Sequence, residues 1–480
     1  MATIIASTAG GNWTATTAWI GGIVPTASSI AILGSQSGPI TVNALTNNCL
    51  SFDCTGYANT LNFASNLTVN GANATQSYLI FSAGMTVSGT GTLNLDFLIN
   101  CTFSGKTIPC NINLGAGGTK TINDYVTCNQ LQVSNGTNTL NGGTLSVTNG
   151  INNSTSVNGT SPIVVFGGSI ASANVISNNL FLQGGNITLQ SFFYSAGTLK
   201  YVSGTVSSTG TLTLSTAPTI DIYPVVLNNV SQNNNTTATV SSTMSINGTF
   251  SINVTTGVNQ FNGANILLYG NLTTPALTTG IVSGTSDLFM LGNGTMNFGT
   301  QSTTGRFAMT TDVRGTYSLV SSFMPYSAQT LRISGNVSGL TLSLLNSKPT
   351  IQIDAPTTFN MIQTTVGATF SGNYGFVTYG FSCSTTGNIT LKALNSYLVT
   401  GSLFMQGTLA SPITLQTDVP GTMSIFTLQN GAYEDVGYVN ATDIDSSNGR
   451  TIWGWKAVLV NTLNWNTLTS NGNTRVYASV

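Results

Sequence analysis

The sequence predicts an all-β protein that folds as an elongated parallel β-solenoid (β-helix) with aromatic end caps. Three observations predict this fold class. Apolar and polar residues alternate in short segments, turn-forming Asn-Gly pairs separate many of these segments, and no linker rich in proline or charge interrupts the pattern. A solenoid can grow long because each repeat packs only against its neighbours. We expect N-terminal cap strands over residues 1–39, a solenoid body over 40–430, and a C-terminal cap and contact region over 431–480.

The alternation has the two-residue period of a β-strand. In the segment GTLNLDF, which begins at Gly91, we expect Leu93, Leu95 and Phe97 to share the buried face and Thr92 to face solvent. Related Gly-Thr segments begin at Gly143, Gly197, Gly210, Gly248 and Gly294. The first two intervals between such segments are 52 residues (143 − 91) and 54 residues (197 − 143). A coil of roughly 20 residues would fit two or three times into each interval.

The turns are compatible with two architectures. Asn-Gly pairs recur from Asn70 to Asn471, and both residue types accept the positive φ angles of tight corners. Asn-Gly is also the leading signal for a β-hairpin, so a stack of antiparallel sandwiches is the alternative. The solenoid is favoured because asparagine and threonine recur between the strands, where they can form side-chain ladders from coil to coil.

The composition excludes several kinds of chemistry. Only 5% of the 480 residues are charged, the net charge is −1, and there is no histidine. A Ser-His-Asp nucleophile and a histidine-ligated zinc site are therefore impossible. Nucleic-acid binding requires clusters of lysine and arginine, and no two basic residues are adjacent here. We expect no catalytic residue, no metal and no cofactor.

We expect neither secretion nor membrane insertion. The N-terminal MATIIASTAGGNW has no basic segment before its apolar stretch, so it does not read as a signal peptide, and no apolar run approaches the ~20 residues of a membrane span. Six cysteines in 480 residues do not form a disulfide scaffold. We interpret them as isolated thiols that serve as small core residues.

The five tryptophans all lie near the ends of the chain. Trp13 and Trp19 open the sequence, and Trp453, Trp455 and Trp465 close it. The ends of a solenoid expose apolar cross-sections and unpaired strand edges, which large aromatic residues are suited to cover. We expect Trp13, Trp19 and Trp465 to be structural caps. For the C-terminal tryptophans the alternative is a sugar-binding surface.

Both ends of the chain carry a family resemblance. The segment GNWTATTAWIGGIVPTASSIAIL, the segment CLSFDCTGY that begins at Cys49, and the pair Asn464-Trp465 resemble β-helical virion proteins of tailed bacteriophages, including tail fibres. Relatives usually carry acidic residues where this chain has Ser28 and Ser29. The resemblance implies a virion location, synthesis in the host cytoplasm and other virion proteins as partners. It also implies a possible homo-oligomer such as a trimer, and it transfers no functional residue.

We therefore expect a non-enzymatic virion structural protein, whether tail fibre, spike or capsid-surface appendage, that takes part in host-surface attachment or particle decoration. Its partner at the host would be a cell-surface glycan. We expect the contact surface to include Tyr433, Tyr438, Arg450, Trp453 and Trp455, because binding hot spots favour Trp, Tyr and Arg. The body between the ends is expected to be neutral. The alternatives are a glycan-degrading tailspike and, less compatible with the missing signal peptide, a bacterial surface adhesin.

The C-terminal region also holds the densest group of charges in the sequence. Glu434, Asp435, Asp443 and Asp445 stand close to Arg450 and to two tryptophans. A glycosidase needs two carboxylates across the sugar bond, so a glycan cleft is one interpretation. The favoured interpretation is a solvated, salt-bridged cap in which Arg450 is a surface charge. Asp443 to Gly449 resembles a calcium loop only faintly, because the closing glutamate is replaced by Gly454.

Overall fold

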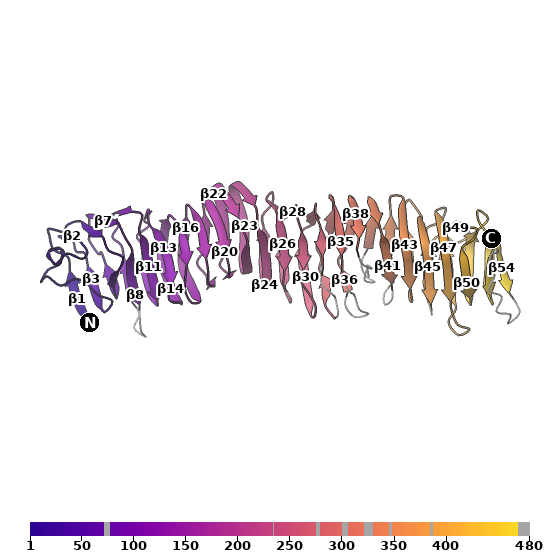
Figure 1. The fold of residues 1–480 in the computed structure, drawn as a ribbon, viewed down its shortest axis with the longest axis horizontal. Helices are drawn as coiled ribbons and strands as arrows, with labels where there is room; N and C mark the ends of the chain where they lie inside the picture. The colour runs from indigo at the N-terminus through magenta and orange to yellow at the C-terminus, as the bar shows by residue number, and fades with distance from the viewer. Residues whose placement is uncertain are drawn as a thin grey trace. The chain divides into compact units, whose positions relative to one another are not determined.

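The computed structural model describes residues 1–71, 77–233, 235–274, 279–299, 306–320, 330–344, 348–384 and 387–468. It divides the chain into two units, Met1–Asn228 and Asn229–Val480. Both units are parallel β-solenoids, with about 20 turns in total and 61% of the residues in strands, which confirms the predicted fold class (Figure 1). The division after residue 228 falls inside the range expected to form one body, and the predicted boundaries at 39/40 and 430/431 stay predictions.

Strands of successive coils pair in parallel within unit 1. Strand β12 (Ile99–Thr102) pairs with β14 (Gly118–Cys128), which in turn pairs with β16 (Asn138–Val147). Cys101 is in register with Ile122, so one coil here takes 21 residues (122 − 101). Because parallel neighbours need a crossover connection, the coil itself supplies that connection. The coil length agrees with the roughly 20 residues expected from the sequence.

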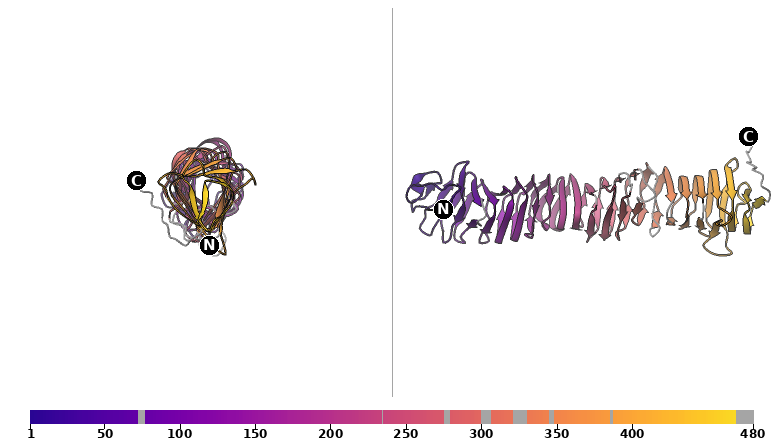
Figure 2. Two further views of the ribbon diagram at one scale, coloured as in Figure 1. Left: turned by 90° about the vertical axis from the view of Figure 1, so that its right-hand side faces the viewer. Right: turned by 90° about the horizontal axis from the view of Figure 1, so that it is seen from below.

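Unit 2 repeats this arrangement with a nearly constant period. Strands β34 (Leu288–Met290), β37 (Thr311–Val313), β39 (Thr330–Ile333) and β42 (Thr350–Ile353) pair in parallel, in that order. Met290, Val313, Ile333 and Ile353 form one column in register, and all four are buried. In each unit the strands wind around an interior filled by such columns (Figure 2). Burial of one apolar residue per coil in each column stabilises neighbouring coils against each other.

The alternation fails where the chain turns a corner. In strand β11 (Thr92–Phe97), Leu93 and Leu95 are buried as predicted, whereas Phe97 is 40% exposed. The prediction for Phe97 is therefore wrong. Its φ of 57° lies in the left-handed region, so the backbone turns at this residue and the side chain leaves the buried face. Alternation thus identifies the inward residues only up to the corner that ends a strand.

Aromatic residues form a column at the N-terminal end of unit 1. Phe52, Phe81 and Phe103 follow one another with centroid distances of 6.3 and 5.5 Å. Trp13 packs on Phe52 at 5.8 Å, and Trp19 meets Trp13 edge-on at 4.9 Å. Trp19 Nε1 also donates to the carbonyl oxygen of Trp13 at 2.7 Å. Both indoles are buried, so they extend the aromatic column beyond its first phenylalanine.

One lysine lies inside unit 1. Lys120 of β14 is buried, and its ammonium group donates to Gly115 O at 3.0 Å, to Gly117 O and to Asn138 Oδ1. Three acceptors match the three protons of an ammonium group. Burial lowers the pKa of Lys120 to about 8, although the negative charge of Asp96 acts in the opposite direction.

The six cysteines are free thiols, and all of them are buried. They are Cys49, Cys54, Cys101, Cys110, Cys128 and Cys383. The interpretation of these residues as small core residues is confirmed. Burial disfavours the thiolate and raises the pKa of both Cys110 and Cys383 to about 12. Among the described residues, no helix has the length and hydropathy needed to span a membrane.

Candidate binding site

The last described coils present one outward face built from three paired strands. Strand β50 (Tyr433–Gly437) pairs with β52 (Ile452–Trp455), which pairs with β54 (Trp465–Leu468). The register Gly437 to Trp455 places the outward side chains of β50 beside those of β52. Tyr433, Trp453 and Trp455, which were predicted from the sequence as contact residues, therefore lie on the same face of this sheet.

This face offers an exposed indole between polar groups. Trp453 is 39% exposed, and Asn466 is its register partner on the following coil. On the preceding coil, Asp435 occupies the equivalent outward position, and its Oδ1 accepts a hydrogen bond from Gln406 Nε2 at 2.5 Å. An indole ring gives an apolar contact area with little conformational freedom to lose, while the carboxylate and amides can bond hydroxyl groups.

A second aromatic pair lies at the corner beside this face. The rings of Tyr438 and Trp455 meet edge-on at 4.6 Å, and Lys456 Nζ lies 4.8 Å from the Trp455 centroid and 5.5 Å from that of Tyr438. Tyr438 and Lys456 have φ angles of 51° and 49°, so both are corner residues of successive coils. We call the set Tyr433, Asp435, Tyr438, Trp453, Trp455 and Lys456 the C-terminal aromatic face.

Arg450 does not belong to this face, which corrects the prediction from the sequence. Its side chain is only 15% exposed, and Nη2 lies 2.6 Å from Glu434 Oε1, on a side chain that is 7% exposed. Arg450 Nη1 also donates to Ala432 O at 2.8 Å. Glu434 points inward because it alternates with Tyr433 and Asp435 in β50, and its register partner Leu403 is buried. Arg450 thus neutralises a buried carboxylate and is not a surface charge.

The remaining carboxylates of the C-terminal cluster also have structural partners. Asp443 accepts from Asn461 Nδ2 at 2.5 Å and from Gly421 N at 2.8 Å, and these hydrogen bonds lower its pKa. Asp445 Oδ1 accepts from the backbone of Ser447 at 2.8 Å. Burial raises the pKa of Glu434, while its pairing with Arg450 opposes that shift. No group of three or more His, Cys, Asp or Glu side chains within the described ranges is arranged to hold a metal ion.

Trp465 lies on the inward side of the same coils. It is buried, it is in register with the buried Ile452, and its Nε1 donates to Ser446 Oγ at 2.7 Å. Ser446 in turn donates to Phe426 O at 2.6 Å. Trp465 therefore packs inside the last described coil and is tied to the two preceding coils. Residues 469–480 of the predicted C-terminal region lie outside the described residues.

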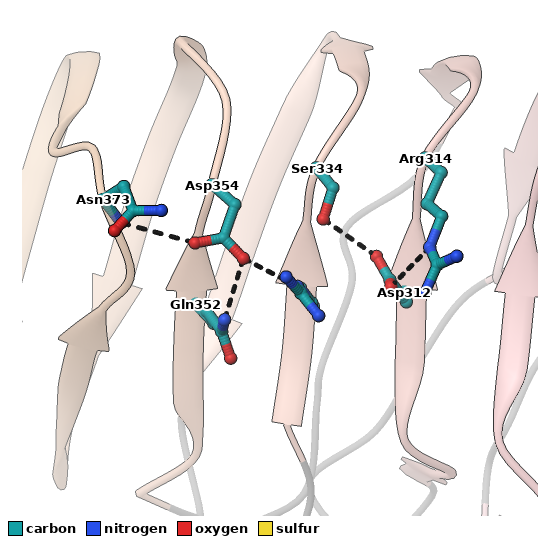
Figure 3. Close-up of polar contacts among 7 residues, drawn as sticks. Asp312, Arg314, Ser334, Gln352, Asp354 and Asn373 are labelled. Atoms are coloured by element: carbon teal, nitrogen blue, oxygen red, sulfur yellow. Dashed lines mark hydrogen bonds and ion pairs between the residues drawn. The ribbon is translucent and has the colours of Figure 1, made fainter.

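A charged cluster in the middle of unit 2 was missed by the sequence analysis, which expected a neutral body. Asp312, Arg314, Arg332 and Asp354 come together on neighbouring coils (Figure 3). A signal for part of it exists in the sequence, because Asp312, Arg332 and Gln352 are spaced by one coil length of 20 residues (332 − 312 and 352 − 332). The structure shows these three residues in register.

Comparison with known proteins places the chain no further than its fold class. No protein-family model, no curated protein and no solved structure matches this sequence or its fold. The chain is therefore defined by its parallel β-solenoid architecture and by the two surfaces described above.

Proposed function

We propose that this chain is a non-enzymatic virion structural protein of a tailed bacteriophage that takes part in host-surface attachment or particle decoration. Its partners are other virion proteins and a host cell-surface glycan, and it works as a homo-oligomer. The resemblance of both chain ends to β-helical phage proteins supports the virion role. The C-terminal aromatic face supports the attachment role.

The observation that carries the proposal is the fixed position of Trp453. The indole is 39% exposed although it sits in a strand paired on both sides, β50 before it and β54 after it. A side chain held by such a scaffold loses little freedom when a ligand binds, so more of the contact energy remains as affinity. Asp435, Gln406 and Asn466 supply the polar groups that a glycan needs around an aromatic platform.

The partners of the carboxylates favour binding over glycan cleavage. A glycosidase needs one carboxyl group free to protonate the leaving oxygen and a second carboxylate opposite it. Glu434 is paired with Arg450 inside the coil, and Asp443 accepts two hydrogen bonds from the protein. Asp435 is the carboxylate placed on the aromatic face, and it is bound to Gln406. This arrangement suits recognition of hydroxyl groups.

The test is binding of the purified protein to host envelope polysaccharide by isothermal titration calorimetry, with the polysaccharide chain length followed by gel filtration. We expect Trp453→Ala to weaken binding and the control Phe193→Ala, which removes an exposed aromatic side chain from unit 1, to leave it unchanged. Equal affinity of wild type and Trp453→Ala would contradict the assignment of the face. Polysaccharide shortening that is lost in Asp435→Asn would instead make the protein a depolymerase.

A further inference from the structure

The charged cluster of unit 2 is an ordered network and not a set of loose surface charges. Arg314 Nε donates to Asp312 Oδ2 at 2.8 Å, and Arg332 Nε donates to Asp354 Oδ2 at 2.6 Å. Figure 3 shows these contacts running across neighbouring strands, together with the bond from Ser334 Oγ to Asp312 Oδ1 at 3.1 Å. Each aspartate thus fixes one guanidinium group.

The two signs of charge are exposed to different extents. The side chains of Asp312 and Asp354 are 7% and 10% exposed, whereas those of Arg314 and Arg332 are 50% and 43% exposed. Asp354 is further enclosed by Gln352 Nε2 at 2.8 Å and by the backbone N–H of Asn373 at 3.3 Å. The cluster is neutral in total, but the charge that faces solvent is positive.

The positions of the two guanidinium groups are also set by the fold. Arg314 lies over the ring of Phe289 with its Cζ 4.7 Å from the centroid, which orients the planar group. Phe289, Asp312 and Arg332 are in register on β34, β37 and β39. Strands of neighbouring coils lie about 4.8 Å apart, so two oriented guanidinium groups stand on adjacent coils.

We propose that this surface, Phe289, Asp312, Arg314, Arg332 and Asp354, binds carboxylate groups of an acidic polysaccharide. The guanidinium fork matches the two oxygens of a carboxylate, and orientation by buried aspartates reduces the entropy lost on binding. A polymer with a carboxylate on each sugar can engage both arginines at once, which a single small anion cannot do. The inference rests on the proposed function in taking a glycan as partner, but it uses a surface separate from the C-terminal aromatic face.

The experiment titrates the full chain with polygalacturonate, with neutral dextran and with inorganic phosphate, and follows heat and melting temperature. We expect polygalacturonate to bind, and the double variant Arg314→Gln/Arg332→Gln to weaken binding by about ten-fold or more. Arg332→Lys keeps a cation beside Asp354, so it should fold as wild type while still binding more weakly, because lysine lacks the planar fork. The control Lys200→Gln removes a cation of similar exposure from the Lys200–Asp221 pair in unit 1 and should change nothing.

Four results would overturn the inference. They are absence of polygalacturonate binding, equal binding by wild type and the double variant, equal loss in the Lys200→Gln control, and full competition by phosphate, which would reveal a simple anion site. None of them depends on Trp453. Loss of host-glycan binding in Trp453→Ala together with any of these results would leave the proposed function standing and remove only this site.

Discussion

Replacing Arg450 with alanine tests whether the C-terminal coil depends on its internal ion pair. The change leaves Glu434, on a side chain 7% exposed, without its cation, and it removes the bond to Ala432 O. Breaking a buried ion pair by removing one partner costs about 3–5 kcal/mol. We expect about 3 kcal/mol, the lower end, because the Arg450 side chain is itself 15% exposed and water can enter the vacated space.

The effect should depend on pH in a defined direction. Burial raises the pKa of Glu434 above its ordinary 4.5 while Arg450 opposes the shift, so removal of Arg450 raises the pKa further. A raised pKa in the folded state means that stability falls as pH increases from the ordinary value through the raised one. The fall is larger in the variant. The free energy of unfolding should therefore differ little between wild type and Arg450→Ala near about pH 3, and should differ fully at pH 7.

Urea unfolding followed by tryptophan fluorescence measures this difference, since Trp453, Trp455 and Trp465 lie on the same coils. The control Lys392→Ala breaks the more exposed pair with Asp418 and should cost less than about 1 kcal/mol. Adding Glu434→Gln to Arg450→Ala should recover part of the loss at pH 7, because no buried charge remains. Equal costs for Arg450→Ala and Lys392→Ala, or a loss independent of pH, would refute the reasoning.

Two further predictions concern unit 1. Leu95→Asp places a charge in the interior and should cost several kcal/mol, whereas Thr92→Asp on the opposite face of β11 should stay within about 1 kcal/mol; equal melting temperatures would contradict the inward assignment. The lowered pKa of Lys120, about 8, lies below its ordinary 10.5, so the unfolded chain holds this proton more tightly and the residue stabilises the fold as pH rises between these values. Wild type should therefore gain stability relative to Lys120→Met from pH 8 to 10 in urea titrations, and parallel curves would show that Lys120 does not titrate in this range.

The sequence was sufficient for the fold class because burial of one strand face leaves a direct trace in residue order. Leu93 and Leu95 follow that trace, and the coil length follows from the recurrence of similar segments. Corners leave a weaker trace. Phe97 and Tyr438 adopt positive φ angles that residues other than glycine rarely adopt, so nothing in their identity announces the turn.

The candidate site was predicted in part. Tyr433, Trp453 and Trp455 share one face because alternation within single strands brings them there. The same alternation assigns Glu434 to the inward face with Val436, and applying it would have placed Arg450 inside as its partner. The cluster around Asp312 and Arg332 depends on contacts between coils. Those contacts become visible only when the coil period of 20 residues is known at that point in the chain.

The buried cysteines make the protein a reporter of its own local opening. A thiol enclosed in the core and held in its protonated form reacts with a labelling reagent only after the surrounding coil has separated from its neighbours. Five of the six thiols belong to residues 1–228 and Cys383 alone to residues 229–480. Mass-resolved labelling kinetics therefore record the opening of each unit separately, without any added probe. A ligand that binds one unit would be recognised by slower labelling of that unit alone.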